Sequence, residues 1–284
     1  MVKITLLFLL STTYILSNIN AVVSILPQKT FLKAIGGEKV NISLMVLPGN
    51  SPHTYEPKPS QMDSVAKADL YFAMDVEFEH VWLPKFTSLN SNMKIVDIAE
   101  NVEKMHLGQA HDGHESHDEH AHEGKDPHIW TSPENVKIIA QNIYEALARY
   151  DAQNADYYKS NLEKFLTSIE KTDIKIKEIL STIKNSRTFM VFHPSWGYFA
   201  KTYNLKQIAV EVEGKSPKPK ELVHLIKEAK EEKVTAIFTQ PEFSDSSAKI
   251  IANELNIPVV KVSPLAPNWS ENLINIAKTI AGNN

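Results

Sequence analysis

Cysteine is absent from the 284 residues of this chain. Its absence excludes disulfides, thiolate metal sites and the acylated cysteine of a lipoprotein, so a metal ion would have to be held by histidine, aspartate, glutamate or water. An excess of charge is also missing, because 30 lysines and arginines stand against 34 aspartates and glutamates. A net charge of −4 is too small to indicate nucleic acid or an acidic membrane surface as a partner.

A hydrophobic run long enough to cross a bilayer is missing as well. The apolar run near the N-terminus, residues 4–16, has 13 residues, whereas a transmembrane helix needs about 20. Lys3 precedes the run and a short polar stretch ending at Ala21 follows it, which is the pattern of a secretory signal peptide. We therefore predict a signal peptide over residues 1–21, and a mature protein that is free in a periplasm and has no integral membrane segment.

The remaining sequence alternates short apolar runs with stretches of helical periodicity. This alternation is typical of βαβ units and predicts an α/β fold with mainly parallel sheets. One helix has a clear start, with Ser132 as its N-cap residue and Pro133 at its first helical position. Strands are predicted at 22–26, 40–46, 69–74, 94–97, 188–192, 234–239 and 259–262, and helices at 60–68, 77–87, 133–150, 219–230, 245–255 and 270–281.

Residues 154–183 form one helical pattern without glycine or proline. A helix of that length spans about 45 Å and can act as a rigid beam between two lobes. A coiled-coil dimer is the alternative, but the apolar stripe breaks between Ile169 and Ile176. We predict an N-terminal lobe over residues 22–153, a linker helix over 154–184 and a C-terminal lobe over 185–284, in a monomeric protein.

Three of the eleven histidines stand alone in turns that contain proline. They are His53 in SPHTYEP, His128 in DPHIW and His193 in FHPSW. His53 and His193 follow predicted strands, and open α/β sheets bind ligands outside the carboxyl ends of their strands. Three imidazoles suit Zn²⁺, which favours four-coordinate nitrogen sites. Taken alone, however, each of these histidines is more often an ordinary loop or core residue.

The segments around these histidines resemble the solute-binding proteins of bacterial zinc and manganese ABC importers. The matching segments are SPHTYEPKPSQ, DPHIW, FHPSWGYFA, SPKPKELVHLIKEAKEEKVTAIFTQPEFS and VVKVSPLAP, which follow one another through nearly all of the chain after residue 21. The resemblance implies two α/β lobes beside a long rigid helix, with metal in the interlobe cleft. His53 and His128 would come from the first lobe and His193 from the second. A permease and its ATPase would be the partners, and the protein would not be an enzyme.

One departure from the family pattern bears on the metal. Manganese-type members pair two histidines with two carboxylates, one of them in an Asp-Pro-Leu-like stretch. This chain has Ser263, Pro264 and Leu265 there, and His193 in place of the other carboxylate. The resemblance therefore implies Zn(II), since nitrogen ligands favour zinc over the oxygen-preferring Mn²⁺. The fourth ligand stays open between water, a carboxylate such as Glu79 or Glu242, and a histidine of the loop described next.

Residues 105–125 interrupt the alternation with a loop rich in histidine, glycine and acidic residues. Six histidines fall within 17 residues, namely His106, His111, His114, His117, His120 and His122. Such tracts bind metal, and ordering a loop with little to bury is costly, so we predict weak secondary metal sites. A solvated insert without a role is the alternative. We expect the loop to collect zinc, pass it on or sense its excess, whereas His80 and His224 are interpreted as surface or packing residues.

The sequence thus predicts high-affinity capture of Zn(II) in the periplasm and delivery to an ABC importer. A manganese or other divalent-metal binding protein, or a metal-binding adhesin, would use the same fold. A zinc hydrolase also uses three histidines and a water, but the chain contains no HExxH motif and no evident paired general base. An open pocket would favour the hydrolase, and a nearly closed one the binding protein.

Overall fold

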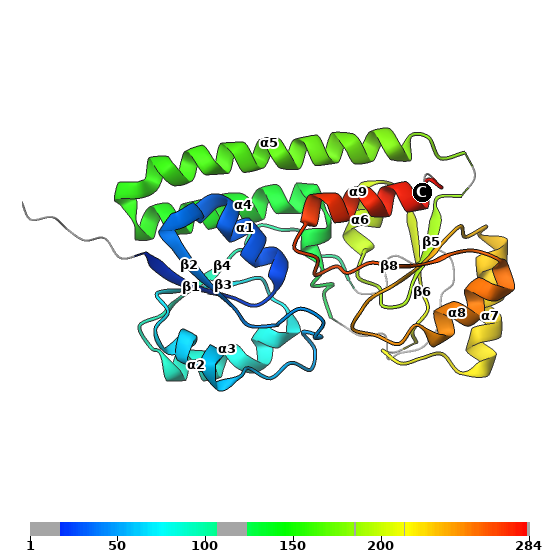
Figure 1. Ribbon diagram of the computed structural model, residues 1–284, viewed down its shortest axis with the longest axis horizontal. Helices are drawn as coiled ribbons and strands as arrows, with labels where there is room; N and C mark the ends of the chain where they lie inside the picture. Colours follow the sequence, from blue (N-terminus) through cyan, green and yellow to red (C-terminus); the bar gives the residue numbers. More distant parts are fainter. Residues whose placement is uncertain (1–17, 107–123, 185, 213, 283–284) are drawn as a thin grey trace, which may run out of the picture.

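The computed structural model describes residues 18–106, 124–184, 186–212 and 214–282. Two four-stranded parallel sheets form two lobes, each with helices on both faces of its sheet (Figure 1). The predicted α/β class and two-lobed layout are confirmed. Most of the predicted signal peptide and the histidines between 111 and 122 lie outside the described residues.

The N-terminal lobe has the strand order β2-β1-β3-β4, with every pair parallel. Two helices, α1 and α4, lie on one face of the sheet, and α2 and α3 lie on the other (Figure 1). The elements are β1 (Ile19–Val23), α1 (Leu26–Gly36), β2 (Val40–Leu44), α2 (Pro59–Ala66), β3 (Leu70–Ala73), α3 (Glu77–Leu89), β4 (Lys94–Asp97) and α4 (Pro133–Tyr150), with 3-10 turns at Gly37–Lys39, Ile129–Thr131 and Ala152–Asn154.

The first strand begins three residues earlier than the sequence pattern predicts. It runs from Ile19 to Val23 and pairs with both β2 and β3, so it lies inside the sheet. Cleavage near Ala21 would remove three of its five residues, of which Ile19 and Ala21 are buried. We therefore correct the start of the lobe from residue 22 to residue 19 or earlier. The signal peptide stays a prediction, with its end moved before Ile19.

The C-terminal lobe repeats the arrangement with the strand order β6-β5-β7-β8. Its elements are β5 (Thr188–Val191), α6 (Gly197–Thr202), β6 (Lys206–Ala209), α7 (Pro219–Glu231), β7 (Ile237–Thr239), α8 (Ser246–Leu255), β8 (Val259–Lys261) and α9 (Trp269–Ile280). Two of these elements, α6 and β6, are not predicted by the sequence pattern. These elements have six and four residues, which is too short for a helical or strand period to stand out.

The long helix α5 (Ala155–Leu180) runs along both lobes (Figure 1). It contacts α1 and α4 of the first lobe and α9 of the second. Phe31 of α1 packs against Phe165 of α5 and Trp269 of α9, with ring centroids 5.7 Å apart in each pair. One apolar core therefore continues from the first lobe to the second. A large hinge motion between the lobes would have to break this core.

The segment before α4 ties the lobes together at a second place. The indole N–H of Trp130 donates to the carbonyl of Pro264 at 2.8 Å, and the indole N–H of Trp269 donates to the carbonyl of Trp130 at 2.7 Å. Ser132 is the N-cap residue of α4, as predicted. Its hydroxyl group does not cap the helix, however, but pairs with the hydroxyl of Thr202 in α6 at 2.9 Å.

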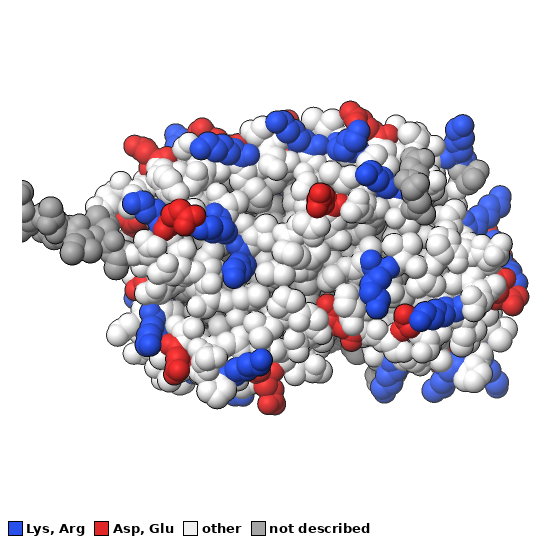
Figure 2. Space-filling model, viewed as in Figure 1, with Lys and Arg blue, Asp and Glu red and all other residues white. Residues whose placement is uncertain are grey.

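The surface of the described residues carries charges of both signs. Figure 2 shows lysine and arginine side chains interspersed with aspartate and glutamate over the face drawn. In the described part of the chain, no helix combines the length and the apolar character that a membrane crossing requires.

Candidate metal centre

The loops after the parallel strands meet between the two lobes and line one cavity. The loop after β2 brings His53, the start of α3 brings Glu77, and the loop after β5 brings His193. The loops after β7 and β8 add Glu242 and Pro264. His128 comes from the segment before α4. This is the place where open parallel sheets bind ligands, and the two sheets face it from opposite sides.

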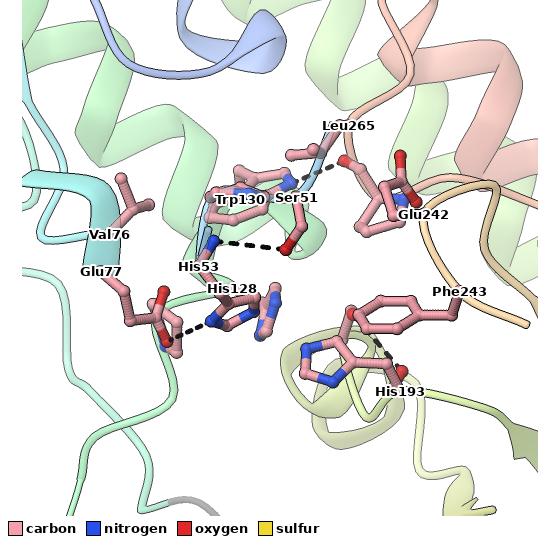
Figure 3. A pocket seen from close by; sticks show the side chains of 14 residues that line it. Ser51, His53, Val76, Glu77, His128, Trp130, His193, Glu242, Phe243 and Leu265 are labelled. Atoms are coloured by element: carbon pink, nitrogen blue, oxygen red, sulfur yellow. Dashed lines mark hydrogen bonds and ion pairs between the residues drawn. The ribbon is translucent and has the colours of Figure 1, made fainter. Parts of the chain in front are cut away.

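The three isolated histidines converge there (Figure 3). The ring centroid of His193 lies 5.3 Å from that of His53 and 5.4 Å from that of His128. Imidazoles that share one tetrahedral Zn²⁺ at about 2.0–2.1 Å have centroids roughly 5 Å apart, so the rings are suitably spaced. Among the described residues, however, no three His, Asp or Glu groups are already arranged to hold an ion. Side chains must therefore adjust as metal enters.

Each of the three rings has a carboxylate beside its Nδ1 atom. Asp126 Oδ1 lies 2.7 Å from Nδ1 of His128, and Glu211 Oε1 lies 2.8 Å from Nδ1 of His193. Glu77 Oε1 lies farther away, 3.6 Å from Nδ1 of His53. A carboxylate that is hydrogen-bonded to Nδ1, as Asp126 and Glu211 are, holds the proton there and leaves the lone pair of Nε2 for a metal ion. Glu77 lies beyond hydrogen-bond distance of His53.

The Nε2 atom of His193 is buried, and no described group forms a hydrogen bond with it. A buried polar atom without a partner is costly and calls for an explanation. The backbone around the ring is well fixed, because the amide of Gln240 donates to the carbonyl of His193 at 2.6 Å. The ring stacks on Phe243 with centroids 5.0 Å apart. A bound cation would satisfy the lone pair of this buried Nε2 atom.

His53 is the least constrained of the three rings. Its side chain is 35% exposed, against 9% for His128 and 15% for His193. Burial, together with the neighbouring rings of His193 and His128, lowers the pKa of His53, and Glu77 partly opposes this effect. A lowered pKa keeps the imidazole neutral, which is the form that binds metal.

The cavity is small and has mostly apolar walls. Its volume is about 30 Å³, which is room for an ion and little else. Apolar walls come from Val76, Trp130, Phe243 and Leu265. Exclusion of water by such walls strengthens the electrostatic attraction between a cation and its ligands.

Glu79, predicted as a possible fourth ligand, does not line the cavity. Its carboxylate is 1% exposed and accepts hydrogen bonds from the hydroxyl of Ser24 and the backbone N–H groups of Met74, Asp75 and Val76. Burial raises the pKa of Glu79 to about 7, and these hydrogen bonds oppose the rise. Glu79 caps the N-terminal end of α3, so we withdraw it as a candidate metal ligand. A glutamate at the third helical position is typical of such capping.

Two other carboxylates border the cavity. Glu242, the second predicted candidate, does line it, and burial raises the pKa of its carboxyl group. Figure 3 shows Glu242 on the far side of the cavity from Glu77. Glu77 was not predicted as a site residue, although it lies two residues before Glu79 at the same helix start. The role of Asp126 could have been predicted from the sequence, because Asp126 lies two residues before His128. Nothing in the sequence links Glu211 to His193.

The remaining histidines lie away from this cavity, as far as the structure describes them. His106 pairs with Lys125 in an isolated antiparallel bridge at the base of the histidine-rich loop. His80 is exposed on α3, and its Nε2 atom lies 2.6 Å from Oδ1 of Asp75. His224 is exposed on α7. The interpretation of His80 and His224 as surface or packing residues is confirmed, because both are exposed.

Comparison with known proteins gives a consistent result. The family model described as "Zinc-uptake complex component A periplasmic" matches residues 21–282. The solved structure of ZnuA is 40% identical, covers 94% of this chain and 99% of its own, and superposes with a TM-score of 0.85. A ZnuA deletion mutant with zinc bound gives the same identity and TM-score and covers 94% of this chain and 98% of its own.

Curated relatives carry both metals in their names. The metal ABC transporter substrate-binding lipoprotein ScbA of Streptococcus cristatus is 30% identical over 255 residues, which are 85% of this chain and 77% of ScbA. The manganese ABC transporter substrate-binding lipoprotein PsaA of Streptococcus anginosus is 29% identical over 240 residues, which are 80% of this chain and 74% of PsaA. Zinc and manganese proteins are thus both among the relatives.

Proposed function

Because this chain belongs to the ZnuA family of substrate-binding components of metal ABC importers, we propose that its cargo is Zn²⁺. Members of the family are extracytoplasmic binding proteins and not enzymes, and their partners are a permease and an ATPase. We further propose that this chain works in the periplasm without a lipid anchor, since it contains no cysteine to acylate. Its ligands for zinc would be His53, His128 and His193.

The observation that supports these ligands is the convergence of three imidazoles whose Nδ1 atoms all have carboxylate neighbours. The hydrogen bonds of Nδ1 to Asp126 and Glu211 leave Nε2 of His128 and His193 available for a metal ion. All three histidines line one small cavity, and the Nε2 of His193 has no described partner. Neutral nitrogen ligands suit Zn²⁺ better than Mn²⁺, which prefers oxygen. Water or Glu77 would complete four-coordination, and Glu242 is the more distant candidate.

The position after β8 also favours zinc. Ser263 contributes a hydroxyl group, which accepts the backbone N–H of Leu265 at 3.1 Å and lies 3.4 Å from Glu242 Oε1. A carboxylate at this position would add the negative charge and the oxygen ligand that Mn²⁺ favours. The zinc hydrolase is disfavoured, because the chain contains no HExxH motif and no evident paired general base.

Release of the cargo would come from movement of the loop that carries His53. The lobes share a core along α5 and α9, so prising them apart is costly. The loop after β2 is more accessible, since the side chain of its His53 is 35% exposed, against 9% for His128 and 15% for His193. We propose that the importer draws this loop aside and so removes one ligand of three.

A competition titration with a zinc chelator tests the proposed function. The full chain should bind one Zn²⁺ tightly, with further ions bound weakly by the histidine-rich loop. A titration in which no ion is bound more tightly than the loop ions would refute it.

Removal of the histidine-rich loop should separate the two kinds of site. The ends of the loop are close, because the N–H of Asp126 donates to the carbonyl of Met105 at 2.8 Å. A Gly-Gly linker from His106 to Gly124, replacing residues 107–123, can therefore leave Asp126 in place. We expect the tight ion to remain, the weak ions to be lost and zinc uptake by cells at limiting zinc to slow. Unchanged uptake would refute a capture role for the loop.

A further inference from the structure

The hydroxyl group of Tyr198 joins the two lobes at the base of the histidine-rich loop. It accepts a hydrogen bond from the backbone N–H of Met105 and donates one to the carbonyl of Asp126, both at 2.9 Å. The backbone N–H of Asp126 also donates directly to the carbonyl of Met105 at 2.8 Å. The Tyr198 side chain comes from α6 and is 4% exposed. One buried hydroxyl group thus fixes the backbone of Asp126.

Asp126 is also the residue that orients His128. Its Oδ1 atom lies 2.7 Å from Nδ1 of His128 and accepts the backbone N–H of the same residue at 2.9 Å. Asp126 and His128 are 5% and 7% exposed. A displacement of the Asp126 backbone would therefore be transmitted to the His128 ring.

Gly197, the first residue of α6, lies against the same carboxylate. A Cβ atom at this position would lie 2.9 Å from Oδ2 of Asp126, closer than real Cβ atoms approach other heavy atoms. Its next neighbour, Cε of Met105, is at an ordinary 4.0 Å. A side chain at position 197 would therefore push on the carboxylate of Asp126 and on little else.

We propose that Tyr198 and Gly197 are positioning residues of the metal site, which act through Asp126 on the ring of His128. The inference rests on the proposed function, because it takes His128 as a ligand. A carboxylate held in place keeps the proton on Nδ1 and the ring in one orientation, so less entropy is lost when metal binds to Nε2. Partners of ligating histidines typically change metal affinity 10–100-fold when they are mutated.

The test uses Tyr198→Phe in the full chain, with Zn²⁺ affinity measured by chelator competition. We expect affinity to fall about ten-fold, the lower end of the range for such partners. Tyr203→Phe is the matched control. Its hydroxyl group is also in the second lobe and buried, and it donates to Oδ1 of Asp173 on α5 at 2.9 Å, away from the site. The control should lose a similar amount of thermal stability and bind zinc as the wild type does.

A double-mutant cycle distinguishes positioning from a general loss of stability. In an Asp126→Ala background, Tyr198→Phe and Gly197→Ala should each change zinc affinity by less than about two-fold, because they no longer have a carboxylate to displace. In the wild-type background, each should cost about ten-fold. The ¹⁵N shifts of His128 in the metal-free Tyr198→Phe protein should show a mixture of tautomers.

Equal losses in both backgrounds, or wild-type affinity in Tyr198→Phe, would overturn the positioning role. Failure of the wild-type chain itself to bind zinc would overturn the proposed function and this inference with it. If the wild type binds and the Tyr198→Phe protein binds equally well, only the inference falls.

Discussion

Replacing His193 with alanine should weaken Zn²⁺ binding by roughly 10²–10³-fold. Four-ligand zinc sites in peptides contribute about 10–16 kcal/mol, so one ligand in four corresponds to about 3–4 kcal/mol, or two to three decades of Kd. We expect the largest effect at His193 because it is the proposed ligand from the second lobe and its Nε2 atom has no described partner. Chelator competition at neutral pH measures the change.

The metal-free His193→Ala protein should remain folded, as circular dichroism would show. Loss of His193 leaves the carboxylate of Glu211 buried without its partner. His193→Gln keeps most of the side-chain volume and serves as a second variant if the alanine protein unfolds. His224→Ala, at an exposed position on α7, is the control and should bind zinc normally. Wild-type affinity in a folded His193→Ala or His193→Gln protein would refute the three-histidine site.

Acidification should weaken zinc binding steeply. Imidazole binds metal only when neutral, so protons compete for the ligands, and Kd rises as pH falls below the ordinary histidine pKa of about 6.5. Burial lowers the pKa of His53, so its proton competes only at still lower pH. Once all three rings are protonated in the free protein, each bound ion displaces three protons, and Kd should rise up to about 1,000-fold per pH unit.

The chain lacking residues 107–123 is the material for this pH series, because the loop histidines would add proton competition of their own. The His193→Ala variant should show a limiting slope of two protons instead of three. Zinc affinity that does not change between pH 7 and pH 5 would contradict histidine ligation.

Much of the fold could be predicted because hydrophobic periodicity follows from burial. The predicted bounds of β4 and α4 agree with the structure, and α5 is the long helix that the pattern at 154–183 indicates. The start of β1 could not be predicted from the sequence, because the apolar N-terminal run is followed almost directly by an apolar strand. Only the pairing of β1 with β2 and β3 fixes this boundary. Ser132 is the N-cap residue that the sequence predicts, but its hydroxyl group pairs with Thr202 of the other lobe instead of the helix, which no local pattern indicates.

The candidate site was predictable where the ligands stand in distinctive turns, and less so where tertiary packing decides. His53, His128 and His193 were selected from sequence, and the structure brings their rings together. The prediction of Glu79 as a possible fourth ligand was wrong, because its carboxylate is turned inward to cap the start of α3, whereas Glu77 at the same helix start lines the cavity. Neither the bond between Glu211 and His193 nor that between Tyr198 and Asp126 leaves a local sequence pattern, because both join distant segments.

Diffraction at the zinc absorption edge tests the proposed site most directly. Crystals of the chain lacking residues 107–123 would be grown with equal concentrations of Zn²⁺ and Mn²⁺. We predict one zinc peak between the lobes, at about 2.0–2.1 Å from Nε2 of each of the three histidines, and no manganese in the cavity. Manganese in the cavity, or zinc held without all three of His53, His128 and His193, would contradict the proposed site.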